Sequence, residues 1–208
     1  MKNTEWGAVS YLSYSIYGIN KEINTNNNSN HITGYSSTSS ADQSKYPGTY
    51  GLTSDITLPY NTETGYLAST TGNISGVYDI CGGTHEYMAA YKEGSFGKSG
   101  FEVDPASIYG SKYFDIYSST STVNNYSDRI LGDATGEMGP FYIYIDADDV
   151  NRIHNNWGGD FTYFVNDERP WFGRGGTMSS GVLGGQFYFE RYPGSSNEKI
   201  SFRVVIAK

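Results

Sequence analysis

The chain has 208 residues, a net charge of −8, 26 glycines and 20 tyrosines, and 17% of its residues are charged. With only 14 lysines and arginines, it has no basic surface to neutralise phosphates, which excludes nucleic acid as a partner and disfavours anionic membrane surfaces. No apolar run reaches about 18 residues, so we expect no direct membrane insertion. The length fits one domain over residues 1–208.

The first predicted element is a helix over residues 4–17. Its apolar residues recur at steps of three and four, and they are Trp6, Val9, Leu12 and Ile16. Asn3 or Thr4 would cap its start and Gly18 would end it. Because the chain begins almost inside a helix, we expect it to be the C-terminal part of a longer polypeptide.

Loops and short strands are predicted for the rest of the chain. Three stretches between residues 24 and 72 are rich in Asn, Ser and Thr and predict loops. Residues 73–91 predict two short buried strands around a tight glycine turn. Alternation predicts further strands near residues 141–146 and 187–190, and a closing strand with Ile200, Phe202, Val204 and Ile206 on one face. The pattern indicates an α+β fold with an antiparallel sheet, one or two helices and abundant loops.

Two motifs carry a resemblance to a known family. The segment GVYDICGGTHEY, residues 76–87, resembles the core signature of formylglycine-generating-enzyme (sulfatase-modifying factor) domains. The segments PWFGRGG, GQFYFERYPG and ISFRVVIAK are similar to that family's closing pattern, and ILGDATGE and MKNTEWGAVSYL support the match. The resemblance implies a C-type lectin fold of the formylglycine-generating-enzyme-like subclass.

Structural roles are predicted for several residues in these motifs. Glycines are expected where the chain needs a positive φ or a close backbone approach, at Gly76, Gly82, Gly175 and Gly176. Arg203 lies between two apolar residues, so its stem can pack while its guanidinium bridges loop carbonyls or a carboxylate such as Asp79 or Glu86.

Catalytic machinery is not indicated. Oxidase members of the family hold copper between two cysteines, whereas this chain has only Cys81, which we predict to be a buried small apolar residue. The three histidines, His31, His85 and His154, lack the spacing of a metal site. We therefore predict no enzymatic activity and no cofactor. Structural calcium stays open, because the acidic loop with Asp146, Asp148 and Asp149 could hold it or could simply be solvated.

The C-terminal part of the chain is the predicted binding region. Tyr, Ser, Gly and Asn supply rigid contact area and adaptable hydrogen bonds, as in antibody loops. The stretch between residues 174–176 and 201–203 resembles the variable region in the variable proteins of diversity-generating retroelements from bacteria and phages. The predicted ligand-binding residues are Trp171, Phe172, Thr177, Met178, Ser179, Ser180, Val182, Leu183, Tyr188, Glu190, Arg191 and Tyr192.

The resemblance implies a non-catalytic binding or adhesion module. Its partner would be a cell-surface protein or a glycan, and its location would be extracellular, on a cell surface, a pilus or a phage virion. Two alternatives remain open, a degenerate oxidase of the same family and a structural capping domain.

Overall fold

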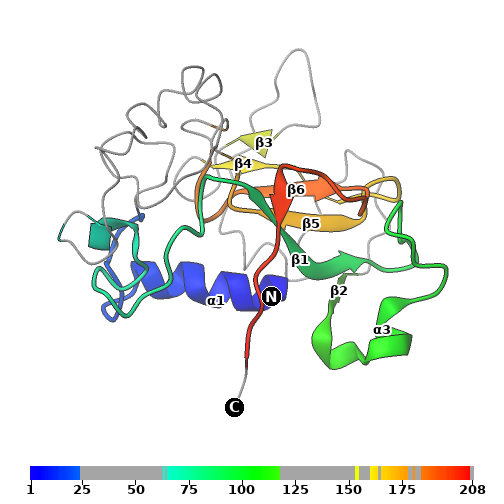
Figure 1. The fold of residues 1–208 in the computed structure, drawn as a ribbon, viewed down its shortest axis with the longest axis horizontal. Helices are drawn as coiled ribbons and strands as arrows, with labels where there is room; N and C mark the ends of the chain where they lie inside the picture. The colour runs from blue at the N-terminus through cyan, green and yellow to red at the C-terminus, as the bar shows by residue number, and fades with distance from the viewer. Residues whose placement is uncertain are drawn as a thin grey trace.

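Figure 1 shows the computed structural model of the chain. The structure describes residues 1–23, 63, 65–117, 153–154, 160–163, 165–177, 180 and 184–206, without the side chains of residues 153–154. The strand predicted near residues 141–146 and the calcium candidates Asp146, Asp148 and Asp149 lie outside these residues, as does His31.

One mixed β-sheet forms the centre of the described fold (Figure 1). Its strand order is β2-β1-β5-β6-β4-β3, and β7 also pairs with β1. The strands are β1 (His85–Lys92), β2 (Asp115–Tyr117), β3 (Ile153–His154), β4 (Phe161–Thr162), β5 (Trp171–Arg174), β6 (Phe189–Tyr192) and β7 (Ile200–Ser201). Together with the helices α1 (Asn3–Tyr14) and α3 (Pro105–Tyr109), this sheet confirms the predicted α+β class.

The sheet was predicted to be antiparallel, and it is mixed. The pairs β1–β5, β5–β6 and β3–β4 are antiparallel, but β1–β2, β1–β7 and β4–β6 are parallel. Each parallel pair joins strands with a long chain segment between them, as parallel pairing requires. The alternation within a strand carries no information on the direction of its partner, so the sequence could not reveal this.

The two strands predicted over residues 73–91 are one strand. β1 begins after the glycine pair 82–83, whose φ values are 74° and 66°. Before these glycines, the chain forms turns and an isolated bridge between Ser69 and Tyr78. The turn was therefore predicted correctly and the first strand was not.

Helix α1 (Asn3–Tyr14) lies along one face of the sheet, which we call the inner face (Figure 1). A helix was predicted here, but only Trp6 of its predicted apolar face is buried, at 1% exposure. Leu12 and Ile16 are 37% and 84% exposed, and the helix ends before Ile16. The cap also differs, because Lys2 is the N-cap residue and its backbone N–H donates to Glu5 Oε2 at 2.7 Å.

Most buried side chains of α1 are polar, and this explains why the spacing of apolar residues predicted the wrong buried face for the helix. Trp6 Nε1 donates to the Gln186 carbonyl at 2.7 Å, and Ser10 Oγ donates to the same oxygen at 3.1 Å. Gln186 Nε2 donates to Ser13 Oγ at 2.6 Å. Ser10, Ser13 and Gln186 are all 0% exposed. These bonds satisfy polar groups that burial would otherwise leave without partners.

The remaining helices are short. α3 (Pro105–Tyr109) is capped by Asp104, whose carboxylate accepts a bond from the Ala106 N–H at 2.9 Å. The 3-10 helices η2 (Gly65–Ala68) and η3 (Ser111–Tyr113) complete the helical part. No helix among the described residues has the length and apolarity needed to cross a bilayer.

The core lies between α1 and the inner face of the sheet. Its buried apolar members include Trp6, Met88, Phe172 and Phe189. Cys81 belongs to this core at 1% exposure, and burial raises the pKa of its thiol well above the ordinary value. The prediction that Cys81 is a buried small apolar residue is confirmed.

The predicted closing strand is reduced to β7. Its two residues pair with His85 and Glu86 of β1. After Ser201 the chain leaves the sheet and runs past the start of α1 (Figure 1). Phe202, Val204 and Ile206 are 75%, 76% and 88% exposed, so these three residues of the predicted apolar face are open to solvent.

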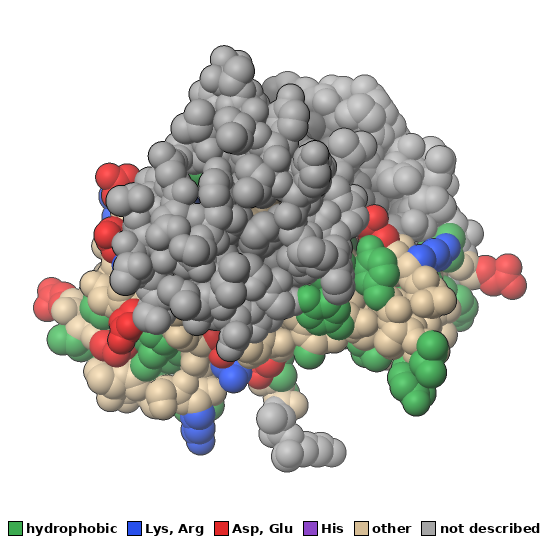
Figure 2. All heavy atoms as spheres, turned by 180° about the vertical axis from the view of Figure 1, so that it is seen from behind, with side chains coloured by type: hydrophobic (Ala, Val, Ile, Leu, Met, Phe, Trp, Pro, Cys, Tyr) green, Lys and Arg blue, Asp and Glu red, His purple; other side chains and the backbone are tan. Residues whose placement is uncertain are grey.

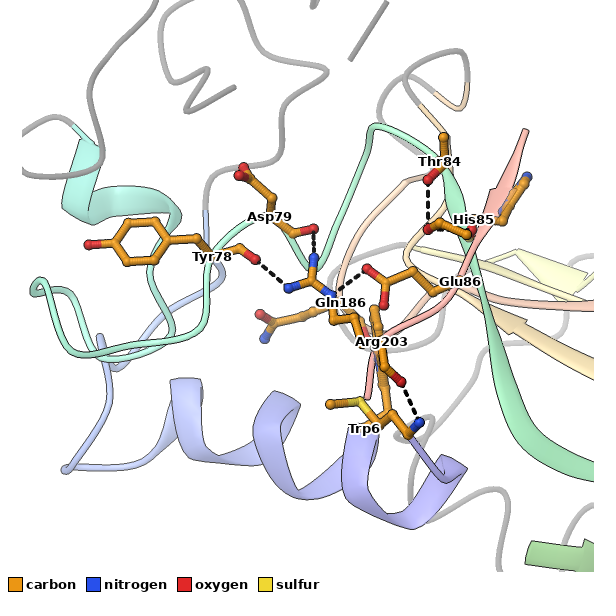
Figure 3. Close-up of polar contacts among 10 residues, drawn as sticks. Trp6, Tyr78, Asp79, Thr84, His85, Glu86, Gln186 and Arg203 are labelled. Atoms are coloured by element: carbon orange, nitrogen blue, oxygen red, sulfur yellow. Dashed lines mark hydrogen bonds and ion pairs between the residues drawn. The ribbon is translucent and has the colours of Figure 1, made fainter. Parts of the chain in front are cut away.

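Arg203 ties the two predicted motifs together (Figure 3). Its Nε donates to Glu86 Oε1 at 2.6 Å, while its two terminal nitrogens donate to the carbonyls of Tyr78 and Asp79. The predicted bridge to loop carbonyls and a carboxylate is confirmed. Gly175 and Gly176 adopt φ values of 85° and 71°, which also confirms the predicted need for glycine after β5.

Candidate functional site

The residues predicted to contact a ligand divide between the two faces of the sheet. Phe172 is 0% exposed and its ring centroid lies 4.7 Å from that of Phe189, so it is a core residue and not a contact residue. Arg191 follows Phe189 at a spacing of two, and its guanidinium lies over the ring of Tyr163 at 3.7 Å. Both side chains thus belong to the inner face.

Two other predicted contact residues are also enclosed. Trp171 is 7% exposed; its ring packs on Tyr91 with centroids 5.1 Å apart, and its Nε1 donates to the Phe96 carbonyl at 3.0 Å. Thr177 is 6% exposed, and its backbone N–H donates to Ser180 Oγ at 2.9 Å. Met178, Ser179, Val182 and Leu183 lie outside the described residues.

Of the four remaining predicted residues, Ser180 lies beside Thr177, and the other three meet at one place. Tyr188, Glu190 and Tyr192 lie on the face of the sheet opposite α1, the outer face, beside His85 and Tyr87 of β1. We call these five residues the tyrosine–glutamate cluster. Glu190 Oε2 accepts hydrogen bonds from the hydroxyls of Tyr188 and, at 3.0 Å, of Tyr192. His85 Nε2 lies 3.8 Å from the same oxygen.

Aromatic contacts hold the cluster together. The His85 ring centroid lies 5.2 Å from those of both Tyr188 and Tyr192. Tyr87 meets Tyr192 edge to face, with centroids 5.6 Å apart. The Tyr87 hydroxyl donates to the Ser195 carbonyl at 3.1 Å. Each ring is thereby restrained by a neighbour as well as by its polar group.

Strand β5 lets these side chains meet because it carries a glycine between them. Gly173 pairs with Tyr87 on one side and with Glu190 on the other. A Cβ added at Gly173 would lie 2.3 Å from Cε2 of Tyr192. The Tyr192 ring therefore lies directly over β5, where any larger residue would displace it.

A buried carboxyl positions the chain that leads into β6. The Phe187 N–H donates to Asp160 Oδ2 at 2.8 Å, and Asp160 is 0% exposed. A Cβ at Gly185 would lie 2.1 Å from Asp160 Oδ1, so the chain approaches the carboxyl as closely as glycine allows. Burial raises the pKa of Asp160 well above its ordinary value. Asp160 thus fixes the backbone from which Tyr188 projects.

The electrostatics of the cluster leave Glu190 facing neutral partners. Burial, with a contribution from the Lys199 charge, lowers the pKa of His85 to about 4, so its imidazole is neutral at pH 7. Burial and the Glu190 charge raise the pKa of the Tyr192 phenol, which therefore keeps its proton and donates it. His85 and Glu86 are adjacent on β1 but point to opposite faces (Figure 3).

The exposure of the cluster is graded. Tyr188 and His85 are 5% and 9% exposed, whereas Tyr87 and Tyr192 are half-buried and the Glu190 side chain is 23% exposed. A partner would thus meet Tyr87, Glu190 and Tyr192 first, with Tyr188 and His85 beneath them.

Sequence reasoning missed His85 and Tyr87. Both lie in the motif of residues 76–87, where His85 was considered only as a metal ligand and Tyr87 was not singled out. Their spacing of two was the available signal, because it places both on one face of a strand. That this face meets Tyr192 could not be known without the strand order.

Within the described part of the chain, no group of three His, Cys, Asp or Glu side chains is arranged to hold a metal ion.

Exposed apolar side chains occur elsewhere on the described surface. Examples near α3 are Val103, Ile108, Tyr109 and Tyr113. Figure 2 shows that, on the side opposite to the view of Figure 1, the hydrophobic side chains of the described residues lie in separate groups among acidic and uncharged ones.

No protein-family model matches the chain, and neither a curated protein nor a solved structure matches it.

Proposed function

We propose that the chain is a non-catalytic binding module of the C-type lectin fold, formylglycine-generating-enzyme-like subclass, which displays the tyrosine–glutamate cluster to a partner outside the cell. The partner is a protein or a glycan of a cell surface, and the module is carried on a cell, a pilus or a phage virion. The observation that carries the proposal is the convergence of two tyrosine hydroxyls on one oxygen of Glu190.

This convergence favours binding because it orders contact side chains before a partner arrives. Immobilising a long side chain at an interface costs about 0.5–1.5 kcal/mol, and this cost is avoided when the free protein already holds the side chain in place. Tyrosine is also among the residues that most often contribute binding energy. Tyr192 is held by Glu190 and by ring contacts to His85 and Tyr87.

The separation of the two sheet faces supports a surface that can change without loss of the fold. Phe172 and Phe189 fill the inner face, and Arg203 joins β1 to the loop before it. None of these residues belongs to the cluster, so the outer side chains of β6 can vary while the core stays the same. A variable surface on a constant frame is what the retroelement-type variable proteins would need.

The fold assignment is supported by the way the two motifs meet. Arg203, from the closing motif, bonds Tyr78, Asp79 and Glu86 of the core signature. The oxidase alternative is less well supported, because Cys81 is enclosed in the core and burial raises the pKa of its thiol. A reactive or metal-binding cysteine needs access and a stabilised thiolate.

The test is capture on arrays of glycans and cell-surface proteins. We expect the protein to bind a subset of the array, and Tyr192→Ala to lose that binding. Tyr113→Ala is the matched control, because Tyr113 is 54% exposed and lies on η3, away from the cluster. Circular dichroism should show that both variants are folded.

Two results of the array experiment would contradict the proposal, and a metal analysis could supply a third. One is the absence of any capture by the wild-type protein, which would favour the capping domain. The other is capture that a folded Tyr192→Ala variant retains in full. Stoichiometric copper or iron in the purified protein would instead favour the oxidase.

A further inference from the structure

We propose that the tyrosine–glutamate cluster recognises an arginine side chain of a partner protein, with the guanidinium bound at Glu190 and stacked on the half-buried ring of Tyr192. This inference rests on the proposed function, because it names the ligand chemistry of the same site.

The phenolic hydrogen-bond donors of the cluster bond to acceptors within the protein. A phenol has a single proton to donate. Tyr188 and Tyr192 donate theirs to Glu190, and Tyr87 donates its proton to the Ser195 carbonyl. Every phenolic donor of the cluster is therefore already engaged within the described structure.

The imidazole adds no free donor toward a ligand. Nε2 of His85 lies 3.8 Å from Glu190 Oε2, so a proton on this nitrogen faces the carboxylate, while a lone pair there would be repelled by it. With the proton on Nε2, Nδ1 is an acceptor. Nδ1 is buried and has no hydrogen-bond partner in the described structure.

What the cluster offers a ligand is therefore acceptors and aromatic faces. Both phenols bond Oε2 of Glu190, which leaves Oε1 of the half-buried carboxylate for a ligand donor. A sugar hydroxyl accepts hydrogen bonds as well as donating them, and an anion only accepts them, so neither suits a site that offers acceptors and no free donors. A cation that only donates does match it.

Guanidinium fits better than a compact ammonium because of its shape. It is planar, it donates to carboxylates in a fork, and it stacks on aromatic rings. The ring of Tyr192 lies beside Glu190, and Tyr87 meets that ring edge to face. Tyr192 is half-buried, so a planar cation can contact its ring and the carboxylate together. Inside the protein, Arg191 already lies over the ring of Tyr163.

The surrounding charge also favours a cation. The chain carries a net charge of −8, which attracts basic partners over longer distances. Lys199 opposes this locally, since its charge contributes to the lowered pKa of His85. Lys199 is exposed, however, so water and salt screen its charge more strongly than that of the half-buried Glu190.

The experiment compares N-acetylarginine amide with N-acetylcitrulline amide, which has nearly the same shape and no charge. Each is titrated into the wild-type protein while NMR follows the ring signals of His85 and Tyr192. We expect saturable shifts with the arginine compound and binding weaker by about tenfold or more with the citrulline compound, since its ureido group still donates hydrogen bonds but lacks the positive charge that strengthens a bond to a carboxylate.

Matched variants then assign the effect to Glu190. Glu190→Gln removes its charge with little change in shape, and we expect the arginine affinity to fall by about tenfold or more. Glu198→Gln makes the same change at an exposed carboxylate and should leave the affinity unchanged.

Several results would overturn the inference. They are equal affinity for the two compounds, the absence of arginine binding, and equal losses in Glu190→Gln and Glu198→Gln. The comparison of compounds uses only the wild-type protein, so it holds even if a variant fails to fold. If array capture needs Tyr192 but the captured partners are glycans, the inference fails and the proposed function stands.

Discussion

Arg203→Ala is the substitution for which the structure makes the sharpest stability prediction. It removes the cation that faces Glu86, whose side chain is only 5% exposed, and it also removes the bonds to two loop carbonyls. Breaking a buried ion pair from one side costs about 3–5 kcal/mol, because a buried charge is left without its partner. The Arg203 side chain is 30% exposed, so we expect a loss of free energy of unfolding at the lower end of this range, about 3 kcal/mol at neutral pH.

The stability that Arg203→Ala loses should be larger near neutral pH than in acid. Burial raises the pKa of Glu86, and Arg203 opposes that rise. A carboxyl with a raised pKa in the folded state costs no stability in acid and becomes destabilising as pH rises through that pKa. Without Arg203 the pKa rises further, so the variant should lose most near neutral pH. In acid only the hydrogen bonds are missing, worth about 1–2 kcal/mol.

Urea unfolding followed by tryptophan fluorescence measures these losses, since Trp6 and Trp171 are 1% and 7% exposed. The melting temperature at neutral pH should fall by about 6–12 °C, from about 2–4 °C per kcal/mol for a chain of this size. Glu86→Gln is the control, and the double variant should be more stable than Arg203→Ala alone. An equal loss at about pH 4 and about pH 7.5 would refute the reasoning.

Two further predictions concern residues that position the cluster. The free energy of unfolding of Asp160→Asn should depend less on pH than that of the wild type. Burial raises the pKa of Asp160, so this carboxyl destabilises the wild type as pH rises through that pKa, and the amide does not. Urea unfolding at several pH values measures this, and the same pH dependence in both proteins would contradict it. Gly173→Ala places a methyl group 2.3 Å from the Tyr192 ring. The clash should lower the free energy of unfolding by about 1–3 kcal/mol. Because it displaces the Tyr192 ring, the substitution should also weaken arginine binding about as much as Glu190→Gln does. Unchanged NMR signals of Tyr192 in that variant would show that its ring does not depend on the glycine.

Some features followed from local patterns and were predictable for that reason. Phe187 and Phe189 alternate with polar residues, and both are 0% exposed. Arg203, flanked by apolar residues, needed acceptors for its guanidinium and has them. Cys81, the single cysteine within an apolar segment, is buried. In each case the residue and its immediate neighbours contained the information.

Other features were misjudged because the decisive contact comes from a distant part of the chain. The inner side of α1 is polar, since Gln186 supplies partners for Ser10 and Ser13. Phe202 has the alternation of a buried strand but is 75% exposed, because pairing with β1 ends at Ser201. Apolar periodicity reports that a residue could be buried, and not whether anything covers it.

For the candidate site, the sequence alone determined the residue types and the segment, since Tyr188, Glu190 and Tyr192 alternate with the buried phenylalanines. Only the tertiary structure decided that this face meets His85 and Tyr87, which lie far away in the chain. The reason is the order of the strands. β5 lies between β1 and β6, and its Gly173 leaves the space in which side chains from both neighbours come into contact.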